Sequence, residues 1–566
     1  MPTAVAFTSS SINRQSSAMC SFLPLVFFSL LLVASNSRVK AEGGEDDLVA
    51  NIPAINFQPN YKTYSGYLYA NQQKTWKMHY MLTTSRSNKT TDPVVFWFNG
   101  GPGCSSFTGS FQELGPMYVD ANGSAIFENV YSWNSIANVV YLESPIGVGF
   151  SYDTTNVNYK QASDDQTAEQ NYAAIADFFV RAQTQFKDRD FFLAGESYAG
   201  IYIPTLAAQI AANLQAFPNQ NFRGVLIGNG FMHVRTLMNS LVQWSYYHGQ
   251  IGYDDWTALK NKTCCQLPSG STDTDQCDWT PYLTTKNGLD YVVGDKTTEC
   301  GKALARTMDI QQDPAVDQYN FYQECYADRS NSSAYPLVPQ AARVQKNPAA
   351  FFNRQSTDAL EGYACVSGQN ALAYFNRSDF AAAFHIDDAF FKAGGFFDDC
   401  SDTMYNTYQA QYNDTTQFFD TIFDKLSNFR ILILNGDVDT VCNFLGDAQF
   451  AKLIADKRGL TSTPRQTWYF RKRVGGYVQR YADQKNSTLD VLTLKGAGHM
   501  TMADRPGPAL QMFERFLTGA ANYGELDAPN PGVPLGQPLL GSGGASGRIS
   551  AGRFFLLSAF FVTLLL

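Results

Sequence analysis

The chain has 566 residues, a formal net charge of −9 and a sequence pI near 5.2. This length suffices for one large α/β core with an inserted region, although three or four smaller domains would also fit. The acidic balance and the lack of any basic cluster argue against a nucleic-acid partner. Metal-ligand spacings such as HExxH or paired CxxC do not occur, so we expect neither a metal nor another cofactor.

The N-terminal segment, residues 1–41, is typical of a secretory signal peptide. The apolar run Phe22–Val33 follows Arg14, and small residues up to Ala41 offer cleavage sites. The run is too short to span a membrane. We therefore expect the chain to enter the secretory pathway and to reach the extracellular space, the cell surface, or a lysosome or vacuole.

Entry into that pathway exposes a chain to glycosylation and oxidation. We expect glycans on several N-x-S/T sequons, which lie at Asn88, Asn122, Asn261, Asn331, Asn376, Asn413 and Asn486. Of ten cysteines, nine remain once Cys20 leaves with the signal, so at least one thiol stays free. Six of the nine crowd the middle of the chain and could form three disulfides in any of fifteen pairings: Cys264, Cys265, Cys277, Cys300, Cys325 and Cys365.

Two strand-to-turn junctions carry the first catalytic signals. Apolar Val94–Phe98 predicts a strand, and the glycine-rich string NGGPGCSS at 99–106 follows it directly. Farther on, apolar Phe191–Ala194 leads into GESYAG, and an apolar helical stretch begins at Ile201. Strand, tight turn and helix in this order present a serine hydroxyl as a nucleophile, so we predict that role for Ser197.

A serine nucleophile needs a histidine base, an orienting acid and amide donors for the oxyanion. His499 stands in GAGHM after the alternating run Asp490–Lys495, whereas the other histidines lie in segments without a catalytic signal: His79, His233, His248 and His385. The apolar run Phe429–Leu434 leads to two candidate acids, Asp437 and Asp439. Serine, acid and then histidine is the chain order of the α/β-hydrolases.

In that fold one oxyanion amide belongs to the residue after the nucleophile, which is Tyr198 here. The other comes from an early glycine-rich loop, which gives Gly101.

We therefore predict an α/β-hydrolase core at 42–232 and 373–525, with a central mixed, mostly parallel sheet flanked by helices. Between the two parts lies a disulfide-rich, mainly helical insertion, 233–372, which we interpret as a lid that admits chain ends. Its aromatic Trp244, Tyr246 and Tyr247 indicate a buried helix at its start.

Several strings together resemble the serine carboxypeptidases, the family of carboxypeptidase Y and cathepsin A. They are spread from about Tyr61 to about Leu517 and comprise NGGPGCSS, ESPIGVGFSY at 143–152, GESYAG with Tyr202 and Pro204, GNG at 228–230, GDVD at 436–439, and GAGHM. The resemblance implies a peptidase that removes C-terminal residues, with Ser197 as nucleophile, Asp439 as acid and His499 as base. Asp437 is then expected to stabilise the turn.

The resemblance also implies further site residues. The carboxylate of the substrate would be held by Asn99, Glu113 and Glu196. The carboxyl groups of Glu113 and Glu196 would lie close together and share a proton, which predicts peptide binding at acidic pH. Met500 and Cys442 would line the pocket for an apolar substrate side chain, with Cys442 as the free thiol, and Cys104 would pair with Cys400. Acyl transfer on the same scaffold and a non-catalytic protective or binding role are the alternatives.

The C-terminal end, residues 526–566, carries a separate signal. A polar, small-residue stretch to Arg553 precedes the uncharged tail Phe554–Leu566. This pattern fits a lipid-anchor (GPI) attachment signal around Ser542–Ser546, and the tail is too short for a membrane span. We therefore expect peptide and protein C-termini as substrates, with membrane attachment through the lipid.

Overall fold

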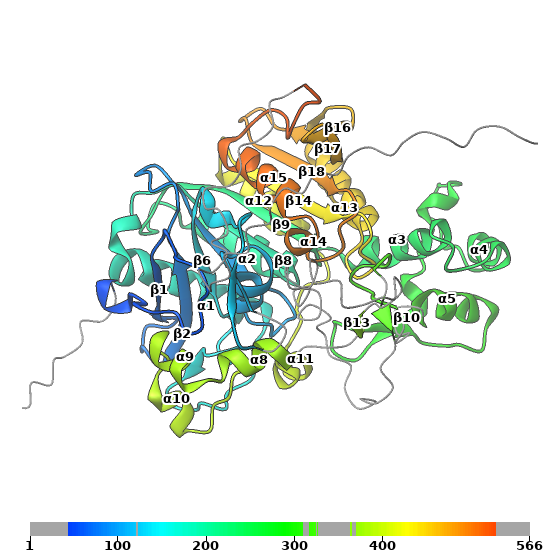
Figure 1. Ribbon diagram of the computed structural model, residues 1–566. Helices are drawn as coiled ribbons and strands as arrows, with labels where there is room; N and C mark the ends of the chain where they lie inside the picture. The colour runs from blue at the N-terminus through cyan, green and yellow to red at the C-terminus, as the bar shows by residue number, and fades with distance from the viewer. Residues whose placement is uncertain are drawn as a thin grey trace, which may run out of the picture. The chain divides into compact units, whose positions relative to one another are not determined.

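The computed structural model describes residues 44–119, 123–309, 316–323, 325–326, 363–364 and 369–527 (Figure 1). The predicted signal segment and the C-terminal segment from residue 528 onward lie outside these ranges, as do the sequons at Asn122 and Asn331 and the cysteine at 365. Among the described residues, no helix combines the length and apolar character needed to cross a bilayer.

One mixed sheet organises the core. Its main path runs β1-β2-β6-β3-β8-β9-β14-β18-β17-β15, with β7 beside β2 and β16 beside β17. The central run from β6 to β18 is parallel, and both edges are antiparallel. The strands are β1 (Thr63–Tyr69), β2 (Trp76–Thr83), β3 (Val94–Phe98), β6 (Asn138–Leu142), β7 (Tyr152–Asp153), β8 (Phe191–Ser197), β9 (Phe222–Gly230), β14 (Arg430–Gly436), β15 (Thr461–Ser462), β16 (Gln466–Phe470), β17 (Arg473–Ala482) and β18 (Thr488–Leu494).

Helices cover both faces of this sheet, so its central strands are buried on each side. In β3, Phe96 packs into one hydrophobic cluster, whereas Val95 and Trp97 pack into the other. Two-sided burial explains why this strand is apolar at every position. The core helices are α1 (Asp164–Asp177), α2 (Ala199–Ala212), α12 (Thr416–Lys425), α13 (Phe444–Arg458), α14 (Thr501–Asp504) and α15 (Pro506–Thr518). This arrangement confirms the expected α/β-hydrolase fold.

The insertion has a small hydrophobic core of its own. It contains α3 (Val234–Tyr247), α4 (Tyr253–Lys260), α5 (Glu299–Asp309) and the hairpin of β10 (Leu283–Thr285) and β11 (Tyr291–Val293). Trp244 is fully buried as expected, but Tyr247 is 70% exposed and contacts only the outer rings of Tyr246 and Trp256 among the aromatic pairs of the described residues. The interpretation of a wholly buried helix is therefore wrong at its last turn.

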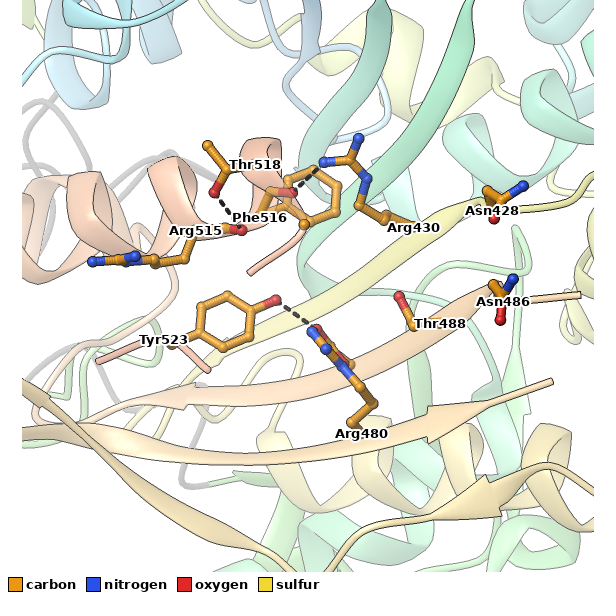
Figure 2. A pocket seen from close by; sticks show the side chains of 11 residues that line it. Asn428, Arg430, Arg480, Asn486, Thr488, Arg515, Phe516, Thr518 and Tyr523 are labelled. Atoms are coloured by element: carbon orange, nitrogen blue, oxygen red, sulfur yellow. Dashed lines mark hydrogen bonds and ion pairs between the residues drawn. The ribbon is translucent and has the colours of Figure 1, made fainter. Parts of the chain in front are cut away.

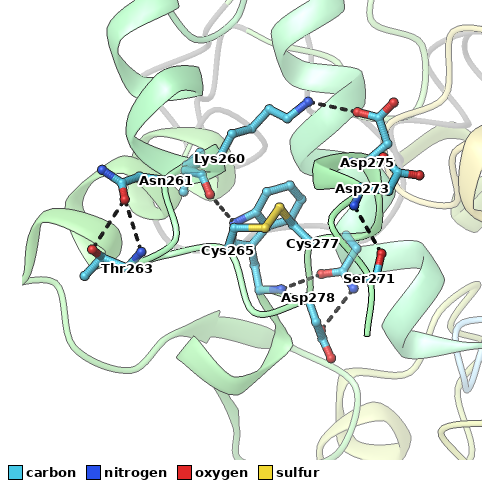
Figure 3. Close-up of a disulfide and its surroundings, with 12 residues drawn as sticks. Lys260, Asn261, Thr263, Cys265, Ser271, Asp273, Asp275, Cys277 and Asp278 are labelled. Carbon is cyan, nitrogen blue, oxygen red and sulfur yellow. Dashed lines mark hydrogen bonds and ion pairs between the residues drawn. A yellow bond between two sulfur atoms is a disulfide. The ribbon is translucent and has the colours of Figure 1, made fainter. Parts of the chain in front are cut away.

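Disulfides join the short elements of the insertion. Cys265 pairs with Cys277 beside the Lys260–Asp275 ion pair (Figure 3). Cys264 pairs with Cys300 at the start of α5. Each native disulfide contributes roughly 2 to 5 kcal/mol to stability. A third disulfide, Cys104–Cys400, links the loop after β3 to the segment before α11.

The remaining elements are short. The helices α8 (Gln369–Phe375), α9 (Ser378–Ala383), α10 (Asp388–Lys392) and α11 (Asp402–Thr407) follow the insertion. Rings of the first three contact Phe107 and Phe150, which are buried in the core. Short strand pairs are β4 (Met117–Val119) with β5 (Ile126–Glu128), and β12 (Cys325–Tyr326) with β13 (Tyr363–Ala364).

Candidate active site

Ser197 occupies a strained turn at the carboxyl end of β8. Its φ is 62°, in the left-handed region that non-glycine residues rarely adopt, and α2 begins two residues later. Glycines on both sides permit this turn, because a Cβ on Gly195 would lie 2.4 Å from the Phe98 carbonyl oxygen and one on Gly200 would lie 2.6 Å from the Phe231 nitrogen. The close approach of Phe231 explains why glycine stands at 200 in GESYAG.

An acid and a histidine lie at the same edge of the sheet. Asp439 follows β14 and His499 follows β18, and these parallel strands are neighbours. The His499 Nδ1 atom is 2.7 Å from Asp439 Oδ2, and both side chains are buried. The other ring nitrogen, His499 Nε2, is buried with no hydrogen-bond partner in the described part of the chain. One nitrogen is thus oriented by a carboxylate while the other remains available.

Further donors hold the Asp439 carboxylate in place. It accepts hydrogen bonds from the backbone amides of Val441 at 2.9 Å and Cys442 at 3.1 Å. Asn229 Nδ2 donates to the same carboxylate at 2.8 Å, and Asn229 Oδ1 accepts from the Gly436 amide at 3.0 Å. The GNG string at 228–230 contributes to the family resemblance but does not by itself assign Asn229 a role. That role emerges only because β9 lies beside β14 in the sheet.

The insertion contacts the loops that carry both residues. The Tyr319 carbonyl accepts from the His499 amide at 2.6 Å, and the two rings meet edge-on with centroids 5.1 Å apart. The Gln318 carbonyl accepts from the Thr440 amide at 3.1 Å, next to Asp439. Asp437 accepts a hydrogen bond from the Gly496 amide at 2.7 Å. It therefore joins the loop after β14 to the loop after β18 without contacting the His499 imidazole.

The glycine-rich loop after β3 lies against the turn at Ser197. A Cβ on Gly100 would lie 2.3 Å from the Tyr198 nitrogen, so only glycine allows this approach. The next residue, Gly101, has a φ of 110° and precedes a cis proline. The two amides expected to bind an oxyanion, those of Gly101 and Tyr198, therefore belong to segments in direct contact.

Asn99, Glu113 and Glu196 form one buried cluster. Asn99 Nδ2 donates to Glu113 Oε1 at 3.1 Å and to Glu196 Oε1 at 3.0 Å. Burial raises the pKa of Glu113 to about 7. Burial, and then the adjacent Glu113 charge, raises the pKa of Glu196 well above its ordinary value. The pair therefore retains a proton at mildly acidic pH, because two buried carboxylates side by side cannot both ionise cheaply.

Two other predicted residues are buried near this edge. Cys442 is a free thiol, and burial together with the charges of Asp439 and Asp447 raises its pKa well above its ordinary value. Met500 follows His499 directly and is 1% exposed. Asp447, for which no sequence motif predicts a role, accepts hydrogen bonds from Asn435 Nδ2 at 2.7 Å and from the Gly230 amide at 3.1 Å. Burial raises the pKa of Asp447 to about 8.

The described sequons are not equivalent. The exposed ones are Asn88, Asn261, Asn413 and Asn486. In contrast, Asn376 Nδ2 donates to the carbonyls of Leu372 and Phe397, each at 3.0 Å. An N-linked glycan leaves one hydrogen on that nitrogen, so it could keep only one of these hydrogen bonds.

The fold, the serine at a strained turn and the His–Asp pair together define a serine hydrolase of the α/β-hydrolase class. A family profile described as serine carboxypeptidase matches residues 53–519, and the chain therefore belongs to the serine carboxypeptidase family. It is an enzyme of that class, as its resemblance to the family implied.

Comparisons with individual proteins agree. Serine carboxypeptidase ctsa-3.1 of Caenorhabditis elegans is 44% identical, over 93% of this chain and 97% of that protein. The lysosomal protective protein of Mus musculus is 32% identical, over 86% of this chain and 97% of its own length. The crystal structure of a prohormone-processing carboxypeptidase, Kex1, from Saccharomyces cerevisiae has a TM-score of 0.61 at 18% identity, covering 84% of this chain and 96% of that one. This last likeness concerns the fold.

Proposed function

We propose that the enzyme removes C-terminal residues from peptides through an acyl-enzyme intermediate on Ser197. His499 Nε2 takes the proton of the Ser197 hydroxyl as its oxygen attacks the last peptide carbonyl. Asp439 keeps Nδ1 protonated and stabilises the imidazolium that forms. The single observation that carries this proposal is the buried His499–Asp439 contact of 2.7 Å at the sheet edge where Ser197 ends β8.

The remaining steps use the same groups. The amides of Gly101 and Tyr198 donate to the tetrahedral oxyanion, and one such donor is typically worth about 3 kcal/mol. As the peptide C–N bond breaks, His499 passes its proton to the departing amine. Water then attacks the acyl carbon while His499 takes the water proton, and Ser197 recovers that proton when the acid leaves.

The carboxyl cluster supports recognition of a free C-terminus at acidic pH. While Glu113 and Glu196 share a proton, that proton and the Asn99 amide are donors for a substrate carboxylate. As pH rises through the raised pKa values, the shared proton is lost and repulsion between the carboxylates replaces it. Binding of the peptide end is therefore strongest below about pH 7, the value to which the Glu113 pKa is raised.

The buried Cys442 and Met500 support a preference for apolar substrate side chains. Neither side chain is charged. The Met500 thioether does not ionise, and burial raises the pKa of Cys442, so its thiol stays protonated at any pH where the enzyme would work. A thiol and a thioether offer dispersion contacts and no partner for a charged side chain. The substrates are thus peptides or proteins that end in an apolar residue.

The sequence signals at the two ends of the chain support a compartment and an attachment. The signal-like segment at 1–41 and the exposed sequons fit the secretory pathway, either at the cell surface or in a lysosome or vacuole. The tail at 526–566 supports attachment to a membrane by a lipid. Release of activity from intact cells by a phosphatidylinositol-specific phospholipase would test that attachment.

A panel of N-blocked dipeptides tests the activity itself. The secreted protein should cleave them with kcat/KM highest for apolar final residues, and Ser197→Ala should lose on the order of a millionfold in kcat. Ser462→Ala, an exposed serine on β15, is the matched control and should behave as wild type. Turnover of sugar esters in place of dipeptides would show an acyltransferase instead, and failure of both substrates would leave the protein without the proposed activity.

A further inference from the structure

The side chain of Tyr198 extends from the candidate active site into the hydrophobic core. Its backbone amide is one of the two donors proposed for the oxyanion, whereas its ring is buried and stacks on Phe231 with centroids 5.6 Å apart. The hydroxyl at the far end of the ring donates to Asp164 Oδ1 at 2.8 Å. Tyr198 is therefore held at both ends, because its amide lies against Gly100.

Asp164, the first residue of α1, accepts hydrogen bonds from four uncharged donors. The hydroxyls of Tyr198 and Tyr408 donate to Oδ1, at 2.8 and 2.9 Å. The backbone amides of Gln411 and Tyr412 donate to Oδ2, at 2.6 and 3.0 Å. Burial raises the pKa of Asp164, and all four donors oppose that rise because they favour the ionised form. Both oxygens of this buried carboxylate are thus fixed by the residues around it.

Asp490 shows how a buried carboxylate is satisfied elsewhere in the same core. It accepts from Arg480 Nε and Nη2, each at 2.7 Å, and from the Tyr523 hydroxyl at 2.7 Å (Figure 2). The guanidinium neutralises this acid, and the three residues join β17, β18 and the segment after α15. Asp164 differs in having a donor that directly follows the nucleophile, Ser197.

The other three donors to Asp164 belong to one segment, residues 399–412. The same segment holds the loop that carries Gly101, the second proposed oxyanion donor. Cys400 forms a disulfide with Cys104, three residues after Gly101, and backbone hydrogen bonds of 2.6 and 3.0 Å flank this disulfide on its two sides. We call residues 399–412 the brace, because they contact both sides of the proposed oxyanion hole.

We propose that the brace fixes the Tyr198 and Gly101 amides relative to each other, and that Asp164 is the positioning residue through which it holds Tyr198. This inference rests on the proposed function, in which both amides bind the oxyanion. The strained backbone at Ser197 makes such a hold necessary, because a non-glycine residue at a φ of 62° persists only when its surroundings over-determine it. Since the oxyanion forms only after substrate binding, a misplaced amide lowers kcat and leaves KM nearly unchanged.

Tyr198→Phe in the full secreted protein tests this hold, because it removes the hydroxyl and keeps the ring. With blocked dipeptides, kcat per site titrated by a fluorophosphonate should fall about tenfold at unchanged KM, which is less than the loss of about a hundredfold or more on deleting an oxyanion donor. Affinity for a blocked dipeptide aldehyde, whose adduct with Ser197 places an oxygen in the oxyanion position, should fall by the same factor. Asp164→Asn turns an NH2 group toward two amide donors or two hydroxyls, so it should weaken both at least as much.

Tyr523→Phe is the matched control, since it removes a phenol that donates to a buried carboxylate outside the site. Tyr198→Phe and Tyr523→Phe should lose similar thermal stability, but Tyr523→Phe should keep the kcat and the aldehyde affinity of the wild type. A wild-type protein that cleaves no blocked dipeptide would refute the proposed function itself. If the wild type is active, an unchanged kcat in Tyr198→Phe, or an equal loss of kcat in Tyr523→Phe, would overturn the positioning role alone.

Discussion

The backbone carbonyl of Tyr319 accepts a hydrogen bond from the backbone amide of His499 at 2.6 Å. The first residue belongs to the insertion and the second to the catalytic core. Asn320 extends the contact, because its Nδ2 donates at 3.0 Å to Asp504, which also accepts from the Gly498 amide at 2.7 Å. The insertion therefore holds the loop that carries His499 as well as bordering the candidate site.

Gly498→Ala should disturb this contact. A Cβ at 498 would lie 2.1 Å from the Tyr319 carbonyl oxygen, and backbone atoms must shift to relieve the clash. Since a misplacement of about 1 Å can cost a hundredfold in rate, we expect kcat to fall by about that factor with a smaller change in KM. Gly252→Ala, whose Cβ meets nothing within 4 Å, is the control. Wild-type kcat for Gly498→Ala would show that the insertion contact does not position His499.

Asn229→Ala should weaken the hold on Asp439. The lost hydrogen bond to a carboxylate is worth about 1.5 to 3 kcal/mol, which corresponds to a decrease in kcat of about 10- to 100-fold if Asp439 must stay aligned. Single-turnover kinetics with a blocked dipeptide would measure this step directly. Asn221→Ala, which changes a half-buried asparagine just before β9 whose side chain contacts Asp188 and Arg223, supplies the comparison. An unchanged kcat alongside lowered thermal stability would assign Asn229 a purely structural role.

Glu196→Gln should flatten the alkaline side of the pH profile. In the wild type both carboxyl pKa values are raised, that of Glu113 to about 7, so the shared proton is present at low pH and lost as pH rises. A glutamine keeps its amide donors at every pH and removes the repulsion that develops between two carboxylates. We expect kcat/KM of the wild type to fall about tenfold per pH unit above that range, and that of Glu196→Gln to fall less steeply. Parallel profiles for the two proteins would contradict the shared proton.

The sequence predicted those parts of the site that depend on local pattern. The strand of Val94–Phe98, the turn at Ser197 and the strands before Asp439 and His499 are each set by neighbouring residues, and all lie where the sequence placed them. The resemblance to the serine carboxypeptidases is likewise confirmed. Asn229 could not be given a role, because its contact with Asp439 spans 210 residues and depends on the order of strands in the sheet.

The insertion was harder to predict for a related reason. Its disulfides Cys264–Cys300 and Cys265–Cys277 were two among many permitted pairings. The packing of α4 against α5 brings Cys264 to Cys300, and the antiparallel bridge between Gln266 and Asp278 brings Cys265 to Cys277. Tyr319 carries no catalytic signal of its own, since it contributes a backbone carbonyl. A main-chain contact leaves no trace in the residue type, so sequence pattern alone cannot reveal it.

Asp447→Asn should make the stability of the folded protein less dependent on pH. Burial raises the pKa of Asp447 to about 8, so the folded state holds a proton that the unfolded chain releases near pH 4. Its contribution to stability is therefore complete at low pH and is lost as pH rises from about 4 to about 8, by at most ~1.4 kcal/mol per pH unit. Urea unfolding between pH 5 and 8 would show a smaller slope for the variant. Asp456→Asn, an exposed change on the same helix, should leave the slope unchanged.

A second serine–histidine–carboxylate array lies in the core, and we expect it to be inert. Ser65 Oγ is 2.9 Å from His79 Nε2, and His79 Nδ1 is 2.8 Å from Glu143 Oε2. All three side chains are fully buried, and the Ser65 hydroxyl donates to the Phe384 carbonyl at 2.7 Å. A reagent cannot reach this buried serine, and its hydroxyl proton is already donated to the Phe384 carbonyl. The array therefore has a structural role, because it ties β1 and β2 to the segment after α9.

Labelling with a fluorophosphonate should therefore modify one serine per chain. Peptide mapping should find the label on Ser197, and Ser197→Ala should abolish it. Ser65→Ala should keep full labelling but lose about 1 to 3 kcal/mol of stability, because it leaves a buried histidine nitrogen and a buried carbonyl without their partner. Label on Ser65 in the folded wild-type protein would show that the buried array is reactive and would reopen the assignment of the nucleophile.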